Sequence, residues 1–220
     1  MAPANPELRE LVKEMNRSRL AEQFRNGKTE ALKAEGEIFP SAILPVMASS
    51  KAGNERIFPM KWGFSQRGKT IINARVETAR EKPTFREAWL RHRCIIPVSW
   101  YYEWEHRENN EPGQKYAIRT EQPGLMMLAG LYRMEAGFPA FVILTRPAHE
   151  KLKWMHNRMP VILPDEEVNK WICPGMNPDE TVRNCLTDLS WVPAEKNGAE
   201  NPAGNAVQEI SALYGKEVVW

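Results

Sequence analysis

The sequence predicts a single α+β domain over residues 1–220, with a curled, barrel-like core of mixed or antiparallel strands flanked by helices. Short runs of β-branched, aromatic and other apolar residues follow one another through the middle of the chain, separated by glycine, proline and asparagine. Helical patterns lie at the ends and between these runs. With 42% hydrophobic residues and no repeat or linker, the 220 residues favour one core.

The first elements combine a helix with a strand that proline interrupts. Residues 6–20 form an expected amphipathic helix, because apolar residues recur at helical spacing and Pro6 suits a first turn. Residues 39–48 contain Pro40 and Pro45, which favours an edge strand or an extended loop, since proline cannot donate to a ladder.

Strands dominate the centre and short helices follow. The expected strands are residues 56–64, a run beginning at Ile71 after a turn at Gly68, and residues 94–104, 115–119, 125–132, 140–144 and 161–163. The expected helices are residues 84–93, capped by Thr84, residues 147–154, and two small acidic helices at 165–172 and 178–186. The tail from Ala194 is expected to be loose.

Charge is unevenly distributed although the net charge is only +2. Residues 61–93 hold nine Lys/Arg against three Glu, whereas the chain from residue 165 onward holds four Lys/Arg against ten Asp/Glu. This asymmetry suits a protein with one anion-facing side, and a set of solvated helices explains it equally well.

Cysteine and histidine usage points away from disulfides and metals. Cys94, Cys173 and Cys185 make no even framework and no zinc spacing, and Cys94 sits in an apolar run like a small buried hydrophobe. The four histidines form no metal-ligand spacing, so no metal or cofactor is expected. No stretch is apolar enough to span a membrane and no signal-peptide pattern opens the chain, so we expect a cytoplasmic monomer.

Four residues could carry chemistry or bind a substrate. Asn73 and Arg75 share strand parity, which suits binding of a phosphate-bearing group as well as a plain strand end. Glu103 lies in an aromatic run that would desolvate its carboxylate and raise its pKa, unless the strand is an edge in water. His156 precedes a proline-broken strand and can exchange protons near neutral pH, although lone histidines are more often structural.

Lys61 and Trp62 lie just before the basic stretch. Nucleobases stack on exposed aromatic rings beside cations, so we interpret Trp62 as functional. Phe64, two residues later, is interpreted as a core residue.

Taken in order, these stretches resemble the successive motifs of the SRAP (SOS response-associated peptidase) family. The resemblance spans residues 39–171, and the acidic part at 172–220 matches only loosely. The matching motifs are PMKWG at 59–63, NARVET at 73–78, RCIIP at 93–97, YEW at 102–104, AGL at 129–131, ILT at 143–145 and HNRMPVIL at 156–163.

The resemblance implies a function in DNA damage. Proteins of that family bind abasic sites in single-stranded DNA and attach to them through a cysteine at position 2, whose amine forms a Schiff base and whose thiol closes a thiazolidine. By resemblance, Asn73, Glu103 and His156 surround this adduct as catalytic residues. The implied DNA contacts are Lys61, Trp62, Arg75, Thr145 and Arg158.

The beginning of the chain departs from the family pattern. It reads Met1-Ala2-Pro3-Ala4, without the Cys-Gly-Arg opening, and no other cysteine offers an amine and a thiol on one carbon backbone. We expect a truncated or mis-started chain; the alternative is a natural homologue that kept the groove and lost the covalent step. Smaller departures are Trp100, where glycine is usual, and Arg146, where a second threonine is common.

The expected partner is therefore single-stranded DNA with abasic sites. Two alternatives remain open: a cysteine-type peptidase assisted by Glu103 and His156, and a non-catalytic module that binds another protein. Whether the chain is an enzyme depends on the missing nucleophile.

Overall fold

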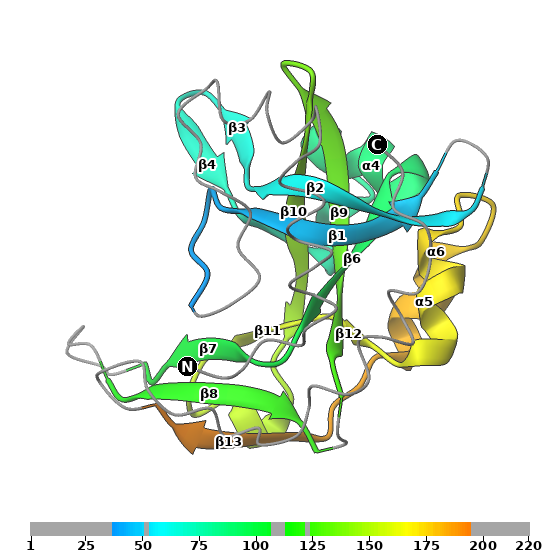
Figure 1. The fold of residues 1–220 in the computed structure, drawn as a ribbon. Helices are drawn as coiled ribbons and strands as arrows, with labels where there is room; N and C mark the ends of the chain where they lie inside the picture. The colour runs from blue at the N-terminus through cyan, green and yellow to red at the C-terminus, as the bar shows by residue number, and fades with distance from the viewer. Residues whose placement is uncertain (1–36, 51–52, 107–112, 122–123, 195–220) are drawn as a thin grey trace, which may run out of the picture.

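Five strands form a closed ring at the centre of the molecule (Figure 1). In the computed structural model, which describes residues 37–50, 53–106, 113–121 and 124–194, each of the five pairs with two neighbours. Around the ring they are β1 (Ile43–Ser49), β2 (Glu55–Trp62), β10 (Phe138–Pro147), β9 (Met126–Glu135) and β6 (Arg93–Val98). The β2–β10 pair is parallel and the other four pairs are antiparallel. The curled mixed sheet predicted from the sequence is thus confirmed.

Short strands extend the ring along β10 and β9. β5 (Asn73–Arg75) pairs in parallel with β10, β11 (Arg158–Pro160) pairs with β10 in the antiparallel sense, and β12 (Ile162–Leu163) pairs with β9. A small hairpin, β3 (Phe64–Gln66) and β4 (Lys69–Ile71), leads from β2 to β5. Strand β10 therefore has four strand partners.

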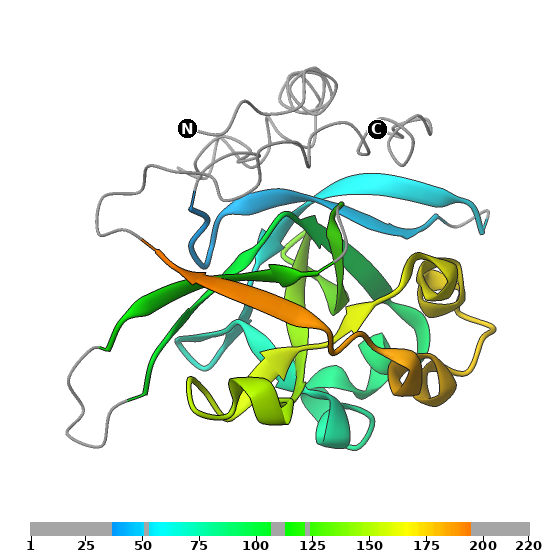
Figure 2. The ribbon, with the colours of Figure 1, turned by 90° about the horizontal axis from the view of Figure 1, so that it is seen from below.

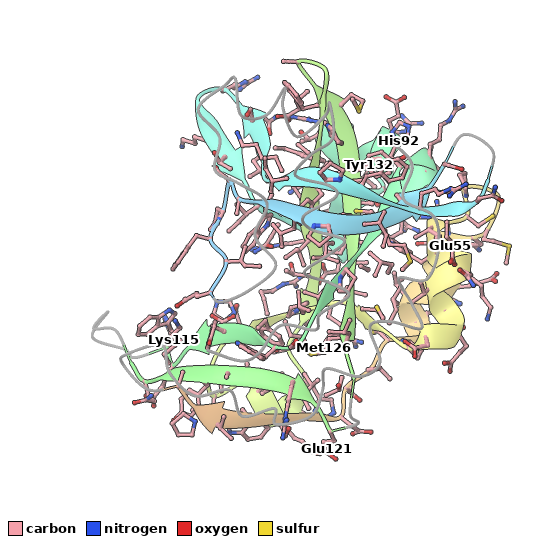
Figure 3. All side chains as sticks on the ribbon, viewed as in Figure 1. Glu55, His92, Lys115, Glu121, Met126 and Tyr132 are labelled. Carbon is pink, nitrogen blue, oxygen red and sulfur yellow. The ribbon has the colours of Figure 1, made fainter. Side chains whose placement is uncertain are left out.

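A second sheet lies across one end of the ring, below it in Figure 1 and toward the viewer in Figure 2. It consists of β7 (Tyr101–Trp104), β8 (Lys115–Thr120) and β13 (Leu189–Pro193), with β8 in the middle. Figure 3 labels Lys115 on this sheet, far from His92 and Tyr132 near the opposite end of the ring.

Helices cover the outside of the ring. They are α3 (Val76–Ala79), α4 (Pro83–Arg91), α5 (Asp165–Ile172) and α6 (Pro178–Thr181), with the 3₁₀ turns η1 (Glu150–Leu152) and η2 (Val182–Asn184). Side chains of α4 and α5 pack on one face of the strands, whereas the other face forms a second cluster that includes residues of β8 and β13. Because both faces of the ring strands are buried, their sequences read as near-continuous apolar runs.

The inside of the ring is tightly packed near Gly130. A Cβ atom at this position would lie 2.5 Å from Ile96 Cδ1 and 3.0 Å from Cys94 Sγ. Cys94 itself is fully buried, as expected, and this burial raises the pKa of its thiol. Only glycine leaves room for these two side chains, since interiors have few voids larger than water.

The prediction of an edge strand over residues 39–48 is wrong, because β1 lies between β2 and β6. The N–H of Trp62 donates to Ala42 O at 2.9 Å, so these two form a hydrogen-bonded pair. Bonded and non-bonded pairs alternate along an antiparallel ladder, which makes Pro45 and Pro59, directly opposite each other, a non-bonded pair. Proline therefore removes no bond from the β1–β2 ladder.

Two other predicted elements are divided. Residues 94–104 were expected as one strand, but they form β6 and β7 in different sheets, with a break at Ser99 and Trp100. The helix expected over residues 147–154 is only the single turn η1, because Pro147 ends β10 and pairs with Arg158 of β11. Tertiary pairing overrides the local helical pattern at this point.

Smaller corrections concern helix ends. Thr84 does not cap α4, which begins at Pro83; instead its Oγ1 accepts a hydrogen bond from Gln66 Nε2 at 3.1 Å. Residues 178–186 form two separate turns, α6 and η2. Strand β13 was not predicted. The helix expected over residues 6–20 and the tail beyond Ala194 lie outside the described residues.

Arg93 is a buried charge that joins two helix ends. Only 2% of its surface is exposed. In the described chain, every hydrogen bond from its guanidinium goes to a main-chain carbonyl. The acceptors are Trp89 O and Leu90 O at the end of α4, and Trp171 O, Cys173 O and Met176 O at and after the end of α5. These carbonyls carry the negative end of each helix, which compensates the buried charge in part.

Candidate functional site

Glu103 and His156 form an acid–base pair between the two sheets. Glu103 lies on β7, and His156 follows η1 just before β11; its Nδ1 lies 3.8 Å from Glu103 Oε2. The two side chains remain 27% and 40% exposed, respectively. A substrate can thus reach both groups while the carboxylate stays largely out of water.

The environment of Glu103 confirms the expected desolvation. Burial raises the pKa of its carboxyl group, and this effect exceeds the opposing influence of His156 and of the Trp104 N–H, which donates to Oε1 at 3.3 Å. Burial, together with the charge of Glu103, raises the pKa of neighbouring Tyr101. A carboxyl group with a raised pKa is better matched to proton transfer near neutral pH.

Main-chain groups of Arg158 hold the imidazole of His156. The Arg158 N–H donates to Nδ1 at 3.1 Å, and Arg158 O lies at the same distance from this nitrogen. Because an amide N–H can only donate, Nδ1 is the acceptor in the neutral ring and Nε2 carries the proton. The contact with Arg158 therefore fixes the orientation of the ring and the tautomer of its neutral form.

A cluster of charged residues adjoins this pair. Arg158 Nη1 and Nη2 donate to Glu77 Oε1 and Oε2 at 2.5 and 2.9 Å, and Nη2 also donates to Thr145 O at 2.7 Å. Arg75 lies opposite Thr145 in the β5–β10 register. Arg75, Thr145 and Arg158 are therefore brought together, and Arg158 connects them to His156.

Glu77 is a site residue that the sequence reasoning did not single out. The hydrogen bonds from Arg158 are the main reason why its pKa lies below the usual range, and the charge of Arg75 acts in the same direction. Glu77 lies inside the NARVET motif, but its partner is 81 residues away, so no local signal marks the pair. The carboxylate keeps the Arg158 guanidinium in place beside Thr145.

Glu77→Gln is expected to lower the free energy of unfolding by about 0.5–1 kcal/mol at pH 7, a small value because the carboxylate is partly exposed. The native pKa of Glu77 is depressed, so the stabilisation is present above the unfolded pKa and disappears as pH falls through the native one. Denaturant unfolding at pH 7 and pH 3 measures this. An equal difference at both pH values would show that charge is not responsible.

Asn73, Lys61 and Trp62 pair with β10 nearer its beginning than Arg75 does. Asn73 pairs with Ile143, one two-residue step of about 7 Å from Arg75, and both side chains are exposed around buried Ala74, as parity predicts. Lys61 and Trp62 pair with the beginning of β10, and both are half-buried. That Asn73 shares one pocket with Glu103 and His156 stays a prediction.

Trp62 is held rigidly. Its Nε1 donates to Ile72 O at 3.1 Å, and its ring stacks on Phe141 with an interplanar angle of 8°. Phe64 is fully buried, which confirms its interpretation as a core residue. Trp62 thus offers a fixed, partly exposed ring edge next to β5.

The described ranges contain neither a metal-binding cluster nor a membrane-spanning helix. No group of three or more His, Cys, Asp or Glu side chains there could hold a metal ion. No helix in that part of the chain is long and apolar enough to cross a membrane.

The fold and the site define a small ring-sheet protein that carries an acid–base pair beside a cluster of arginines. The model of the family described as SOS response associated peptidase (SRAP) matches residues 9–198 of this chain. The chain belongs to the SRAP family, whose curated members found here are abasic site processing proteins.

Several relatives resemble this chain over most of its length. The abasic site processing protein YoqW of Bacillus subtilis is 34% identical over 165 residues, which cover 66% of this chain and 72% of YoqW. The abasic site processing protein YedK of Escherichia coli is 25% identical, with coverage of 75% and 80%.

Solved structures show the same architecture. A phage-related protein from Bordetella bronchiseptica superposes with a TM-score of 0.62 at 26% identity, covering 72% of this chain and 81% of that one. A protein from Bacteroides thetaiotaomicron has a TM-score of 0.67 over 94% and 97% of the two chains. At 21% identity, the second likeness supports the fold alone.

Proposed function

We propose that this chain binds single-stranded DNA, recognises abasic sites and assists covalent chemistry at the exposed sugar. The observation that carries the proposal is the Glu103–His156 pair, which shares Arg158 with a cluster containing Arg75. Abasic site processing is what the names of the relatives state. Arginine near an acid–base pair suits a substrate in which a phosphate flanks the reacting carbon.

The chemistry begins with the abasic sugar, whose ring opens to an aldehyde. An amine condenses with this aldehyde to a Schiff base and releases water; a thiol on the same residue then adds to the C=N carbon and closes a thiazolidine. Such steps need a group that removes protons from the attacking amine and another that delivers them to the sugar oxygen. We assign the first role to Glu103 and the second to His156, with Asn73 holding the amine by hydrogen bonds.

The remaining polar residues act in binding. Arg75 and Arg158 are assigned to DNA phosphates, Thr145 and Lys61 to the same backbone, and Trp62 to stacking. Arg158 already donates two bonds to Glu77, so we expect Arg75 to make the stronger phosphate contact. Phosphate contacts predict binding that weakens steeply with salt.

A cysteine-type peptidase remains the alternative. Within the described chain, His156 forms hydrogen bonds or an ion pair with Glu103, Arg158 and the Leu152 carbonyl, and none of these partners is a cysteine. Cys94 is fully buried and Cys185 contacts Arg146. Since a cysteine nucleophile needs a neighbouring base, these contacts argue against Cys94 and Cys185 as peptidase nucleophiles.

A gel experiment tests the proposal. The chain, and a version with Met-Cys-Gly-Arg joined upstream, are mixed with a single strand that carries one abasic site; the control strand carries a tetrahydrofuran analogue without an aldehyde. We expect both proteins to bind the abasic strand under native conditions, and a denaturant-resistant band only for the cysteine version with the true abasic strand. Failure of both proteins to bind either strand would overturn the proposal.

A further inference from the structure

Aromatic side chains lie on the same face of the second sheet as Glu103. Glu103 on β7 is directly opposite Tyr116 on β8, and Ile118, two residues further along β8, is opposite Trp191 on β13. Opposed residues project to one face, and residues two apart in a strand share that face. Glu103, Tyr116 and Trp191 therefore project together.

Trp154 joins these rings from the segment after η1. Its ring centroid lies 5.2 Å from that of Tyr116, with the planes at 88°, and 6.2 Å from that of Trp191. Its Nε1 donates to Lys151 O at 2.9 Å, so its only donor is satisfied inside the protein. Trp154 nevertheless remains 44% exposed. It offers ring surface, and the contacts keep that surface in a fixed orientation.

The surroundings of Trp154 suit a polyanion. It precedes His156 by two residues, and residues 149–158 contain three Lys/Arg against one Glu. A fixed, exposed indole among cations is a common arrangement for stacking nucleobases, because every base presents a π-face whatever the sequence. The position beside Glu103 and His156 makes the surface continuous with the proposed reaction site.

We propose that Tyr116, Trp154 and Trp191, together called the aromatic platform, bind nucleobases of the DNA strand that carries the abasic site. Trp154 stacks on a base, and Tyr116 and Trp191 hold Trp154. The platform thereby positions the strand on one side of the reactive sugar. This inference rests on the proposed function, since it takes its ligand to be single-stranded DNA.

The test compares two exposed tryptophans: Trp154, which packs over the Glu103 face of the second sheet, and Trp104 on the other face of this sheet. Trp104 is 52% exposed but, by strand parity, projects to the face opposite Glu103, where Lys115 Nζ lies 5.7 Å from its ring. Fluorescence anisotropy with a labelled single strand, without an abasic site, measures binding by the full chain. Trp154→Leu is expected to weaken binding about tenfold and Trp104→Leu less than about twofold.

Two further readouts separate stacking from other causes. Trp154→Phe retains a ring and should recover most of the affinity, whereas the slope of log Kd against log salt concentration should be the same in all variants, because no phosphate contact is removed. Equal affinity of Trp154→Leu and the unchanged chain would overturn the proposed role of the aromatic platform but not the proposed function. Equal losses in the Trp154→Leu and Trp104→Leu variants would do the same. Absence of binding by the unchanged chain would overturn the proposed function with it.

Discussion

Glu103→Gln should slow formation of the DNA adduct by about 100-fold or more while leaving DNA affinity nearly unchanged. The amide keeps the size of the side chain and can still accept the Trp104 N–H, but it cannot take a proton from the attacking amine. The version with Met-Cys-Gly-Arg upstream is used, and single-turnover gels follow the adduct over time. Comparable losses of rate and of affinity would show that Glu103 is structural.

The same variant is expected to be at least as stable as the parent at neutral pH. The native pKa of Glu103 is raised, so its contribution to stability is fully present below the unfolded pKa and is lost as pH rises through the native one. Glutamine carries no charge and avoids this loss. Thermal unfolding at pH 7 and pH 3 should therefore show the variant's advantage at pH 7 only. If the parent became more stable relative to the variant as pH rises, the pKa of Glu103 would not be raised in the folded protein.

Arg93→Leu is expected to lower the free energy of unfolding by about 3–5 kcal/mol. The change leaves the carbonyls at the ends of α4 and α5 without their donor, and the contacts with Trp89 O and Trp171 O are buried. Denaturant unfolding measures the loss. The stability of Arg93→Lys should lie between those of the unchanged chain and Arg93→Leu, since an ammonium group has three donors and cannot span both helix ends.

A matched control comes from Arg80, whose ion pairs with Glu81 and Asp179 at 3.7 and 3.6 Å are exposed. Arg80→Leu should cost less than about 1 kcal/mol. Similar losses in the Arg80→Leu and Arg93→Leu variants would show that the carbonyl contacts of Arg93 contribute little.

The sequence predicted those helices and strands whose apolar pattern is visible within the element itself. The strands of the ring and α5 were found, although β1 was wrongly predicted as an edge, because their apolar runs and periodicity are long enough to be recognised. Strand β13 was missed because its five residues, LSWVP, mix polar and apolar types and gain their regularity only by pairing with β8. Pro45 misled the prediction because its harmless position depends on the register with Pro59.

The candidate site shows the same division. Glu103 was recognisable from its aromatic neighbours, and its raised pKa agrees with that reasoning. Glu77, Arg93 and the aromatic platform were not recognisable, because their partners lie on other elements: Arg158 for Glu77, and main-chain carbonyls for Arg93. Sequence spacing carries no information about such contacts until the strand order is known.

The four partners of β10 have a consequence for synthesis of the protein. During synthesis, β1, β2 and β6 emerge from the ribosome before β10 does. Until β10 emerges, β2 lacks its second neighbour and β5 has no partner strand. Unpaired strands of this kind invite pairing with other chains. The nascent chain is therefore most vulnerable to aggregation before residue 147 emerges, when a chaperone that shields β2 would have its greatest effect.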